Sequence, residues 1–78
     1  MKQILISGRV QGVSFRYNVK EKADEHGLKG WVKNLDDGRV EVVVDKPEEL
    51  IKLCKDFQID TIEIKECQEH CEDFKIKI

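Results

Sequence analysis

The sequence has no apolar stretch approaching the roughly 20 consecutive residues that a membrane-spanning helix needs. We also expect no leader, because Met1-Lys2-Gln3 runs directly into a short strand-like segment. Proline occurs once, at Pro47, and no repeat, linker or low-complexity tract interrupts the chain. We therefore expect a single domain over residues 1–78, with no membrane association.

A basic excess is also missing. The 14 Lys and Arg residues are outnumbered by 16 Asp and Glu residues, which gives a formal net charge of −2. Nucleic-acid-binding domains usually carry clustered positive charge, and RNA-binding sheets add aromatic pairs for base stacking. We expect no nucleic-acid partner. The local basic group formed by Arg9, Arg16, Lys20 and Lys22 suits a small anion better than a long polyanion.

Cysteine is scarce, and the three residues cannot all pair within one chain. A reducing, cytoplasmic location is the simplest interpretation. Together, Cys54, Cys67, His70 and Cys71 have the composition of some zinc sites. However, Cys54 belongs to an apolar helical stripe, and free cysteine usually packs as a small hydrophobic residue. We expect neither a metal nor another cofactor.

What the chain does contain is a series of short periodic runs. Alternation predicts strands at 3–7, 28–34, 39–45, 60–66 and 74–78, and apolar spacing predicts helices over 16–26 and from Pro47 onward. Asp36-Asp37-Gly38 indicates a hairpin turn. Either Asp45 or Lys46 caps the second helix. The order predicts an α+β, ferredoxin-like βαββαβ sandwich, with an antiparallel four- to five-stranded sheet and two helices on one face.

This topology predicts where the chemistry lies. The first two strands run in the same direction with the third between them, so their carboxyl ends share one sheet edge about 10 Å apart. The loop 8–15, the start of the helix 16–26, Asn34 and the turn 36–38 should all meet there.

The loop itself has the features of an anion site. Backbone N–H groups at a helix N-terminus attract anions, and glycines let such a loop curl around a phosphate as a nest. The guanidinium of Arg16 matches two phosphoryl oxygens at once. From these features alone, a tight connection and a solvated surface arginine explain the pattern as well.

Two segments carry a family resemblance. Gly8-Arg9-Val10-Gln11-Gly12-Val13-Ser14-Phe15-Arg16 resembles the acylphosphatase signature G-[RK]-V-Q-G-V-x-F-R, and Gly30-Trp31-Val32-Lys33-Asn34 resembles the second signature, G-W-V-x-N. Both occur in the family's order and separation. The likeness is close over 3–45 and moderate over 46–57. It weakens after that, because the Gly-Pro-Pro loop usual in the family is missing and 67–73 is acidic.

The resemblance implies hydrolysis of a small acyl phosphate to a carboxylate and inorganic phosphate, with Arg16 and Asn34 as catalytic residues. It implies that Arg16 binds the substrate phosphate and that Asn34 positions the attacking water for in-line displacement. The remaining phosphate contacts would come mainly from backbone N–H groups of the loop, at Gln11, Gly12, Val13, Ser14 and Phe15.

Those roles fit phosphoryl transfer, in which positioning and charge stabilisation dominate. A carboxylate leaves without a general acid, and Arg16 stays protonated. We therefore hypothesise that a phosphate oxygen of the substrate takes the water's proton. His26 lies ten residues along the helix, about 15 Å from Arg16. Ser14 has no credible histidine partner, and Asp36 and Asp37 are interpreted as turn residues.

A binding module that holds phosphate without turnover is the main alternative. Acylphosphatase-like domains also occur in larger hydrogenase-maturation proteins, but we expect no such partner domains here, because 78 residues leave no room for them. The presence of both Arg16 and Asn34 favours the enzyme, because a binder needs only the loop and Arg16. We expect a monomer. Trp31, on the strand face opposite Val32, is interpreted as a packing residue and not as a base-stacking platform.

Overall fold

The structure, a computed structural model, describes residues 1–9, 15–53 and 58–77. Its elements follow the order β1 (Lys2–Arg9), α1 (Phe15–Glu25), β2 (Gly30–Asn34), β3 (Val40–Val44), α2 (Pro47–Leu53), β4 (Gln58–Glu66) and β5 (Phe74–Ile76). This is the predicted βαββαβ order with a short additional strand. The largest difference is at β1, which continues through Gly8 and Arg9, where the sequence predicts a loop.

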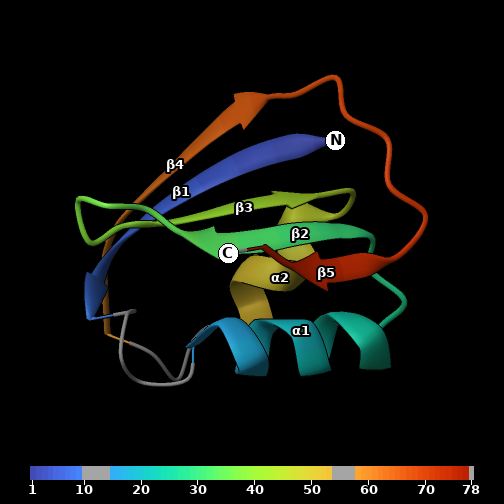
Figure 1. Cartoon of the computed structure of the whole chain (residues 1–78), viewed down its shortest axis with the longest axis horizontal. Helices are drawn as coiled ribbons and strands as arrows, with labels where there is room; N and C mark the ends of the chain where they lie inside the picture. The colour runs from blue at the N-terminus through green and yellow to red at the C-terminus, as the bar shows by residue number, and fades with distance from the viewer. Residues whose placement is uncertain (10–14, 54–57, 78) are drawn as a thin grey trace.

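The five strands form one sheet in the order β4-β1-β3-β2-β5. β3 lies between β1 and β2 and is antiparallel to both, so β1 and β2 run in the same direction, as predicted. β4 is antiparallel to β1, whereas β5 is parallel to β2. The sheet is therefore mixed and not wholly antiparallel. The cause is the connection after β4, which crosses the molecule and brings β5 to the far edge in the direction of β2 (Figure 1).

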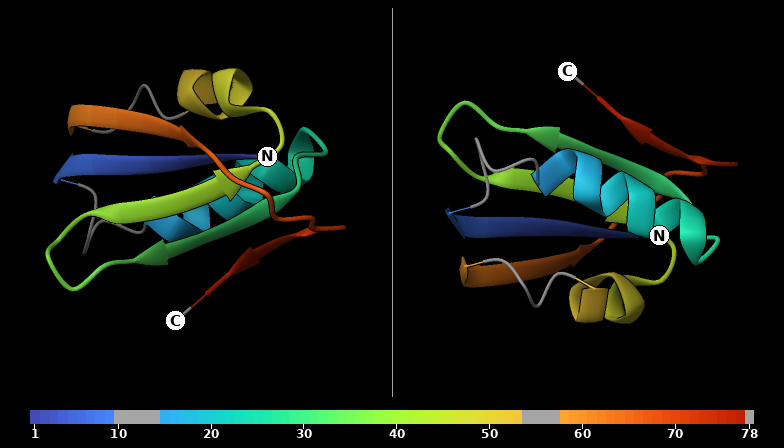
Figure 2. Two further views of the ribbon diagram at one scale, coloured as in Figure 1. Left: turned by 90° about the horizontal axis from the view of Figure 1, so that it is seen from above. Right: turned by 90° about the horizontal axis from the view of Figure 1, so that it is seen from below.

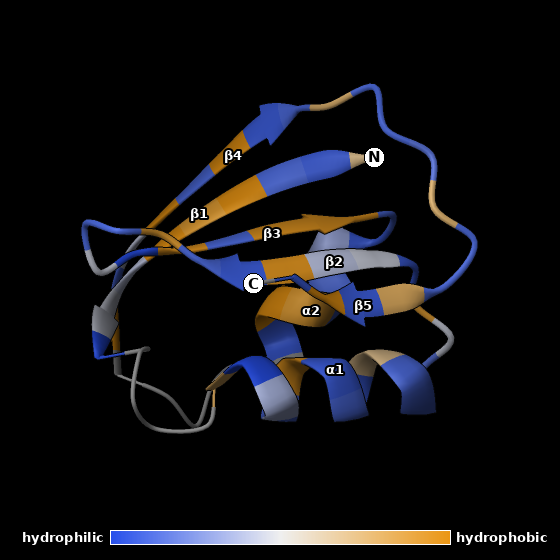
Figure 3. Cartoon of the chain, viewed as in Figure 1, coloured by the Kyte–Doolittle hydropathy of each residue, from blue (hydrophilic) through white to orange (hydrophobic). Residues whose placement is uncertain are grey.

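Both helices lie against the same face of the sheet (Figure 2). The side chains that alternate toward this face form the core with the buried face of α1. The core residues are Ile4, Ile6, Phe15, Val19, Ala23, Leu28, Val32, Val40, Val42, Val44, Leu50 and Phe74. In Figure 3, hydrophobic residues lie along parts of β1 and β3 and on α2, whereas the visible surface of α1 is largely polar. Burial of these apolar side chains is the main force that holds the helices on the sheet.

The start of α2 settles which residue caps that helix. The carbonyl of Lys46 accepts the N–H of Leu50 at 3.3 Å, which is the first intrahelical bond and makes Lys46 the N-cap. The carboxylate of Asp45 instead accepts the backbone N–H of Lys29 at 3.0 Å. On this helix Leu50 is buried. Cys54, which the sequence places on an apolar stripe of the same helix, lies outside the described residues.

Gly30 marks a close approach between two strands. Its φ is +146°, and a Cβ atom there would lie 1.7 Å from the carbonyl oxygen of Val43 on β3. No side chain fits this space, because the obstacle is backbone and cannot rotate away. The glycine that opens the segment 30–34 is thus required by the pairing of β2 with β3.

Candidate active site

The predicted site residues converge on one end of the molecule. The carboxyl ends of β1 and β2, the start of α1 and the β2–β3 turn all lie at the left side of Figure 1. Since one strand separates β1 from β2, their ends are about 10 Å apart. The chain thus brings the beginning of α1 and the end of β2 to the same sheet edge.

Arg16 occupies the first turn of α1 and is half-buried. Phe15, just before it, is buried in the core and fixes the start of the helix. The first turn contains no acidic residue, so the guanidinium lies at the positive end of the helix dipole with no anion from its own turn. None of the ion pairs found among the described residues involves Arg16. This arrangement favours an external anion.

Asn34 is the last residue of β2 and pairs with Val40 of β3. It shares the strand face of Val32, which points toward the helices. Its Oδ1 atom is buried and has no hydrogen-bond partner; in the described part of the chain, it is the one buried side-chain polar atom in this state. An unsatisfied buried acceptor costs about 1–3 kcal/mol. Such an atom is suited to accept a hydrogen bond from a bound water or ligand.

The chain enters the site through an irregular strand end. The pairing of β1 with β4 shifts register between Ser7 and Gly8, and Gly8 has a φ of +136°. Bulges of this kind often lie beside active sites because they redirect the backbone. Of the predicted phosphate-binding residues, Phe15 is described; Gln11, Gly12, Val13 and Ser14 lie outside the described residues. Their role stays a prediction.

The β2–β3 turn follows Asn34 directly. The N–H of Leu35 donates to the carbonyl of Arg39 at 2.8 Å, and the N–H of Gly38 donates to the carbonyl of Leu35 at 3.2 Å. The carboxylate of Asp37 accepts the backbone N–H of Arg39 at 3.0 Å and its Nε–H at 2.8 Å. These bonds from Arg39, the backbone bond first, lower the pKa of Asp37 below its ordinary value. Asp37 therefore stabilises the turn, in agreement with its interpretation as a turn residue.

His26 follows the last residue of α1, at the opposite end of the helix from Arg16. Its side chain is exposed, and its backbone N–H donates to the carbonyl of Lys22 at 3.1 Å. The imidazole is thus separated from the candidate site by the length of the helix. This position agrees with the sequence-based expectation that His26 lies far along the helix from Arg16.

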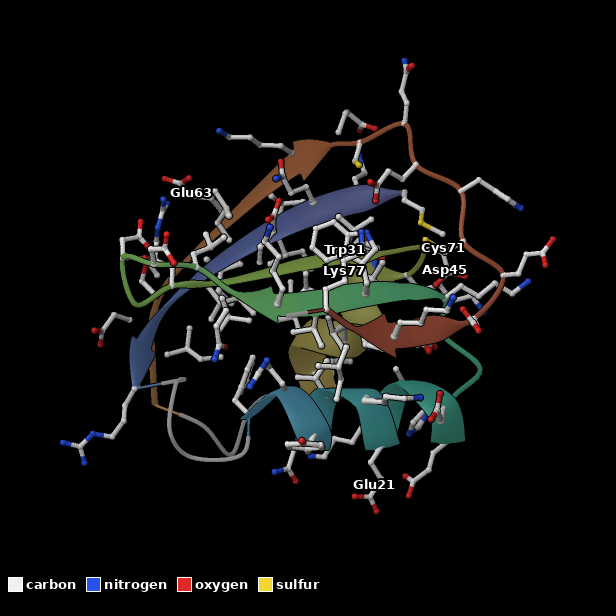
Figure 4. The ribbon with its side chains drawn as sticks, in the orientation of Figure 1. Glu21, Trp31, Asp45, Glu63, Cys71 and Lys77 are labelled. Atoms are coloured by element: carbon white, nitrogen blue, oxygen red, sulfur yellow. The ribbon has the colours of Figure 1, made fainter. Side chains whose placement is uncertain are left out.

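A cavity of about 450 Å³ lies elsewhere, where the start of β2 meets the segment 69–73 and β5. The Trp31 side chain is 8% exposed there, and its Nε1 donates a hydrogen bond to the Glu69 carboxylate at 2.5 Å. The Lys77 ammonium lies 4.2 Å from the centroid of the Trp31 ring, and Figure 4 labels both residues. The strand alternation predicts that Trp31 faces away from Val32. It does not identify the irregular segment after β4 as the covering layer. This cavity lies at the other end of β2 from Asn34.

Cys67 and Cys71 form no disulfide. Cys54 lies outside the described residues, and within the described ranges no three His, Cys, Asp or Glu side chains are grouped so that they could hold a metal ion. Among the same residues, no helix is long and apolar enough to cross a membrane.

Comparison with known proteins identifies the family. The family model for acylphosphatase matches residues 2–76. An acylphosphatase of Bacillus velezensis is 57% identical over 49 residues, which are 63% of this chain and 54% of that protein. The chain thus spans about half the length of that relative.

Solved structures agree. The acylphosphatase of Bacillus subtilis has a TM-score of 0.86 at 36% identity, over 99% of this chain and 97% of that one. The HypF protein of T. kodakarensis has a TM-score of 0.78 at 40% identity, over 100% of this chain but 12% of that one. With its fold, both signature segments and a family match over residues 2–76, the chain belongs to the acylphosphatase family.

Proposed function

We propose that this chain is an enzyme that hydrolyses small acyl phosphates to a carboxylate and inorganic phosphate. The observation that carries the proposal is the buried, unpartnered Oδ1 of Asn34, at the same sheet edge as Arg16 and the start of α1. A cationic group at a helix N-terminus binds the phosphate. An unsatisfied acceptor nearby holds the water. Hydrolysis requires both phosphate binding and a positioned water.

In the proposed mechanism, Arg16 binds two phosphoryl oxygens of the substrate. Backbone N–H groups of Gln11, Gly12, Val13, Ser14 and Phe15 complete the phosphate cradle. Asn34 Oδ1 accepts a hydrogen bond from a water and aims its oxygen at phosphorus, in line with the carboxylate leaving group. The new bond joins the water oxygen to phosphorus, and the bond from phosphorus to the carboxylate oxygen breaks.

Proton movement in this mechanism needs no side-chain base. The water's proton passes to a phosphate oxygen of the substrate, and the carboxylate leaves as a stable anion. The guanidinium of Arg16 keeps its charge throughout and stabilises the equatorial oxygens. We propose that the reaction needs no metal, that one chain is the complete catalytic unit and that it works in the cytoplasm.

The deciding experiment is a hydrolysis assay of the purified chain in the presence of a chelator. A generic acyl phosphate should be hydrolysed, and an ordinary phosphate monoester should not. Loss of acyl phosphate turnover on chelation would contradict a metal-free site. Equal turnover of the monoester would contradict the assignment of substrate class.

Two variants test the residue roles. Arg16→Ala should lower kcat/KM by about 10²-fold or more, through both binding and rate. Asn34→Ala should lower kcat by about 10²-fold with little change in KM, because it acts on the water. Lys20→Ala, on α1 one turn beyond Arg16, and Lys33→Ala, beside Asn34 on the other sheet face, are the matched controls. Full activity of Asn34→Ala would refute its assigned role.

The rival function is phosphate binding without turnover. The match to a small part of HypF shows that this domain occurs within a much longer chain. Equilibrium titration with inorganic phosphate separates the two functions. Arg16-dependent binding without any acyl phosphate hydrolysis would establish the binder and reject the enzyme.

A further inference from the structure

The outer edge of the sheet at β4 is long and carries two exposed isoleucines. β4 has nine residues and pairs with β1 on one side only, within the described chain. Ile62 is 36% exposed and Ile64 is 48% exposed. A free edge of this kind offers backbone N–H and C=O groups to another strand.

The two faces of this edge differ in character. Ile62 and Ile64 stand opposite the buried Ile6 and Ile4, so they extend the core-facing rows of β1 beyond the cover of the helices. Glu63 and Lys65 alternate with them on the opposite face; Glu63 is labelled beside β4 in Figure 4. Neither charge forms an ion pair with another described residue.

We propose that β4 is a self-association surface, on which a second copy of this chain adds its own β4 antiparallel about a two-fold axis perpendicular to the sheet. The occupant is identified by the symmetry of the charges. In a two-fold antiparallel pair, residues equally distant from the centre face each other on the same side of the sheet. A pairing centred on Ile64 therefore sets each Glu63 against Lys65 of the other copy, twice in the interface.

Neighbouring registers lack this complementarity. A centre at Glu63 opposes two Glu63 carboxylates and sets Asp60 against Glu66, and a centre at Lys65 opposes two ammonium groups. Like charges directly opposite are destabilising. A centre at Ile62 forms no opposite-charge pair. The charge pattern thus selects Ile64 as the centre, where Ile64 of one copy faces Ile64 of the other.

The resulting dimer is weak and leaves the candidate active site open. The pairing uses residues 62–66, at the carboxyl end of β4, whereas the amino end of β4 lies beside the site edge at Arg9. One strand pair buries less area than a standard stable interface of about 1,600 Å². We expect a reversible dimer at protein concentrations on the order of 10⁻⁴ M or higher, and the monomer predicted by the sequence below that.

Sedimentation equilibrium over a concentration series tests the interface. The wild type should shift from monomer to dimer mass. Lys65→Glu and Glu63→Lys should each weaken dimerisation by about tenfold or more, because they create like-charge pairs. The double variant E63K/K65E keeps the net charge and should restore the dimer. A monomer at every concentration, or a dimer indifferent to the single charge reversals, overturns the proposal.

Cross-linking tests the register. In a C54S/C67S/C71S background, oxidation of the Ile64→Cys variant should give a covalent dimer, because the two residues 64 face each other at the axis. The matched Ile62→Cys variant should stay monomeric, since residue 62 faces residue 66 of the other copy. Equal cross-linking of both variants, or preferential cross-linking at position 62, contradicts this register. Hydrolysis of acyl phosphate is not needed for any of these measurements, so their outcome is independent of the proposed function.

Discussion

At the scale of the residue, Gly30 shows how backbone sterics account for a signature position. Gly30→Ala places a Cβ 1.7 Å from the carbonyl oxygen of Val43, so β2 and β3 must separate locally. We expect the free energy of unfolding to fall by about 2–4 kcal/mol, measured by urea denaturation. Gly27→Ala is the control, because Gly27 has a φ of +67° but open space around it. Its cost should be about 1 kcal/mol, and equal losses at both positions would contradict the steric explanation.

The same scale shows what the sequence could predict about the candidate site. The strand alternation predicts that Asn34 ends a strand at the edge reached by the start of α1, and the structure confirms this position. The buried state of its Oδ1 is a property of tertiary packing, and no local pattern encodes it. Arg16 differs, because its place at a helix start and its charge are both readable from the chain. Its partner, the substrate, stays a proposal.

At the scale of the element, the β2–β3 turn predicts a pH dependence. Asp37 has a pKa lowered by the backbone N–H and guanidinium of Arg39, so its contribution to stability is present above the ordinary carboxyl value of 3.8. It is lost as the pH falls through the lowered pKa. Asp37→Asn should therefore destabilise the protein at pH 7, and the difference from wild type should shrink below about pH 4.

Denaturant unfolding of both proteins between pH 7 and pH 2.5 measures this difference. Asp36→Asn is the control, because Asp36 is exposed in the same turn and forms no hydrogen bond or ion pair with a described residue. Its stability should follow wild type over the whole range. A constant difference between Asp37→Asn and wild type would mean that the carboxylate charge is not what stabilises the turn.

The segment between β4 and β5 is the element that sequence patterns describe least. Residues 67–73 have no period, and the alternation at Phe74 and Ile76 predicts a strand but not its partner. The parallel pairing of β5 with β2 depends on the long connection that crosses the molecule after β4, and local residue propensities cannot reveal such a connection.

Glu69→Ala removes the acceptor of the Trp31 Nε1 hydrogen bond. We expect red-shifted tryptophan fluorescence and faster hydrogen exchange in residues 67–73, with Glu72→Ala as a control without this shift.

At the scale of the whole molecule, ligand binding and folding are linked. A ligand that binds only the folded chain stabilises it by RT ln(1 + [L]/Kd), about 1.4 kcal/mol at ten times Kd. For a domain of 78 residues, inorganic phosphate should then raise Tm by about 5–10 °C. Arg16→Ala should abolish the rise, because the anion loses its cationic partner. Asn34→Ala should keep it, since its proposed partner is the water and not the phosphate.

A comparison of Arg16→Ala with Lys20→Ala distinguishes phosphate binding at the site from nonspecific salt effects on stability. Ions that act by exclusion from the protein surface stabilise every variant to the same extent. Lys20→Ala removes a cation from the same helix, where Lys20 pairs with Asp24, and should show the full rise. A phosphate-induced shift that is equal in Arg16→Ala and Lys20→Ala would place the effect in the solvent and not at the start of α1. A phosphate-induced rise in Tm that is lost only in Arg16→Ala would mean that phosphate bound at the start of α1 stabilises the whole fold.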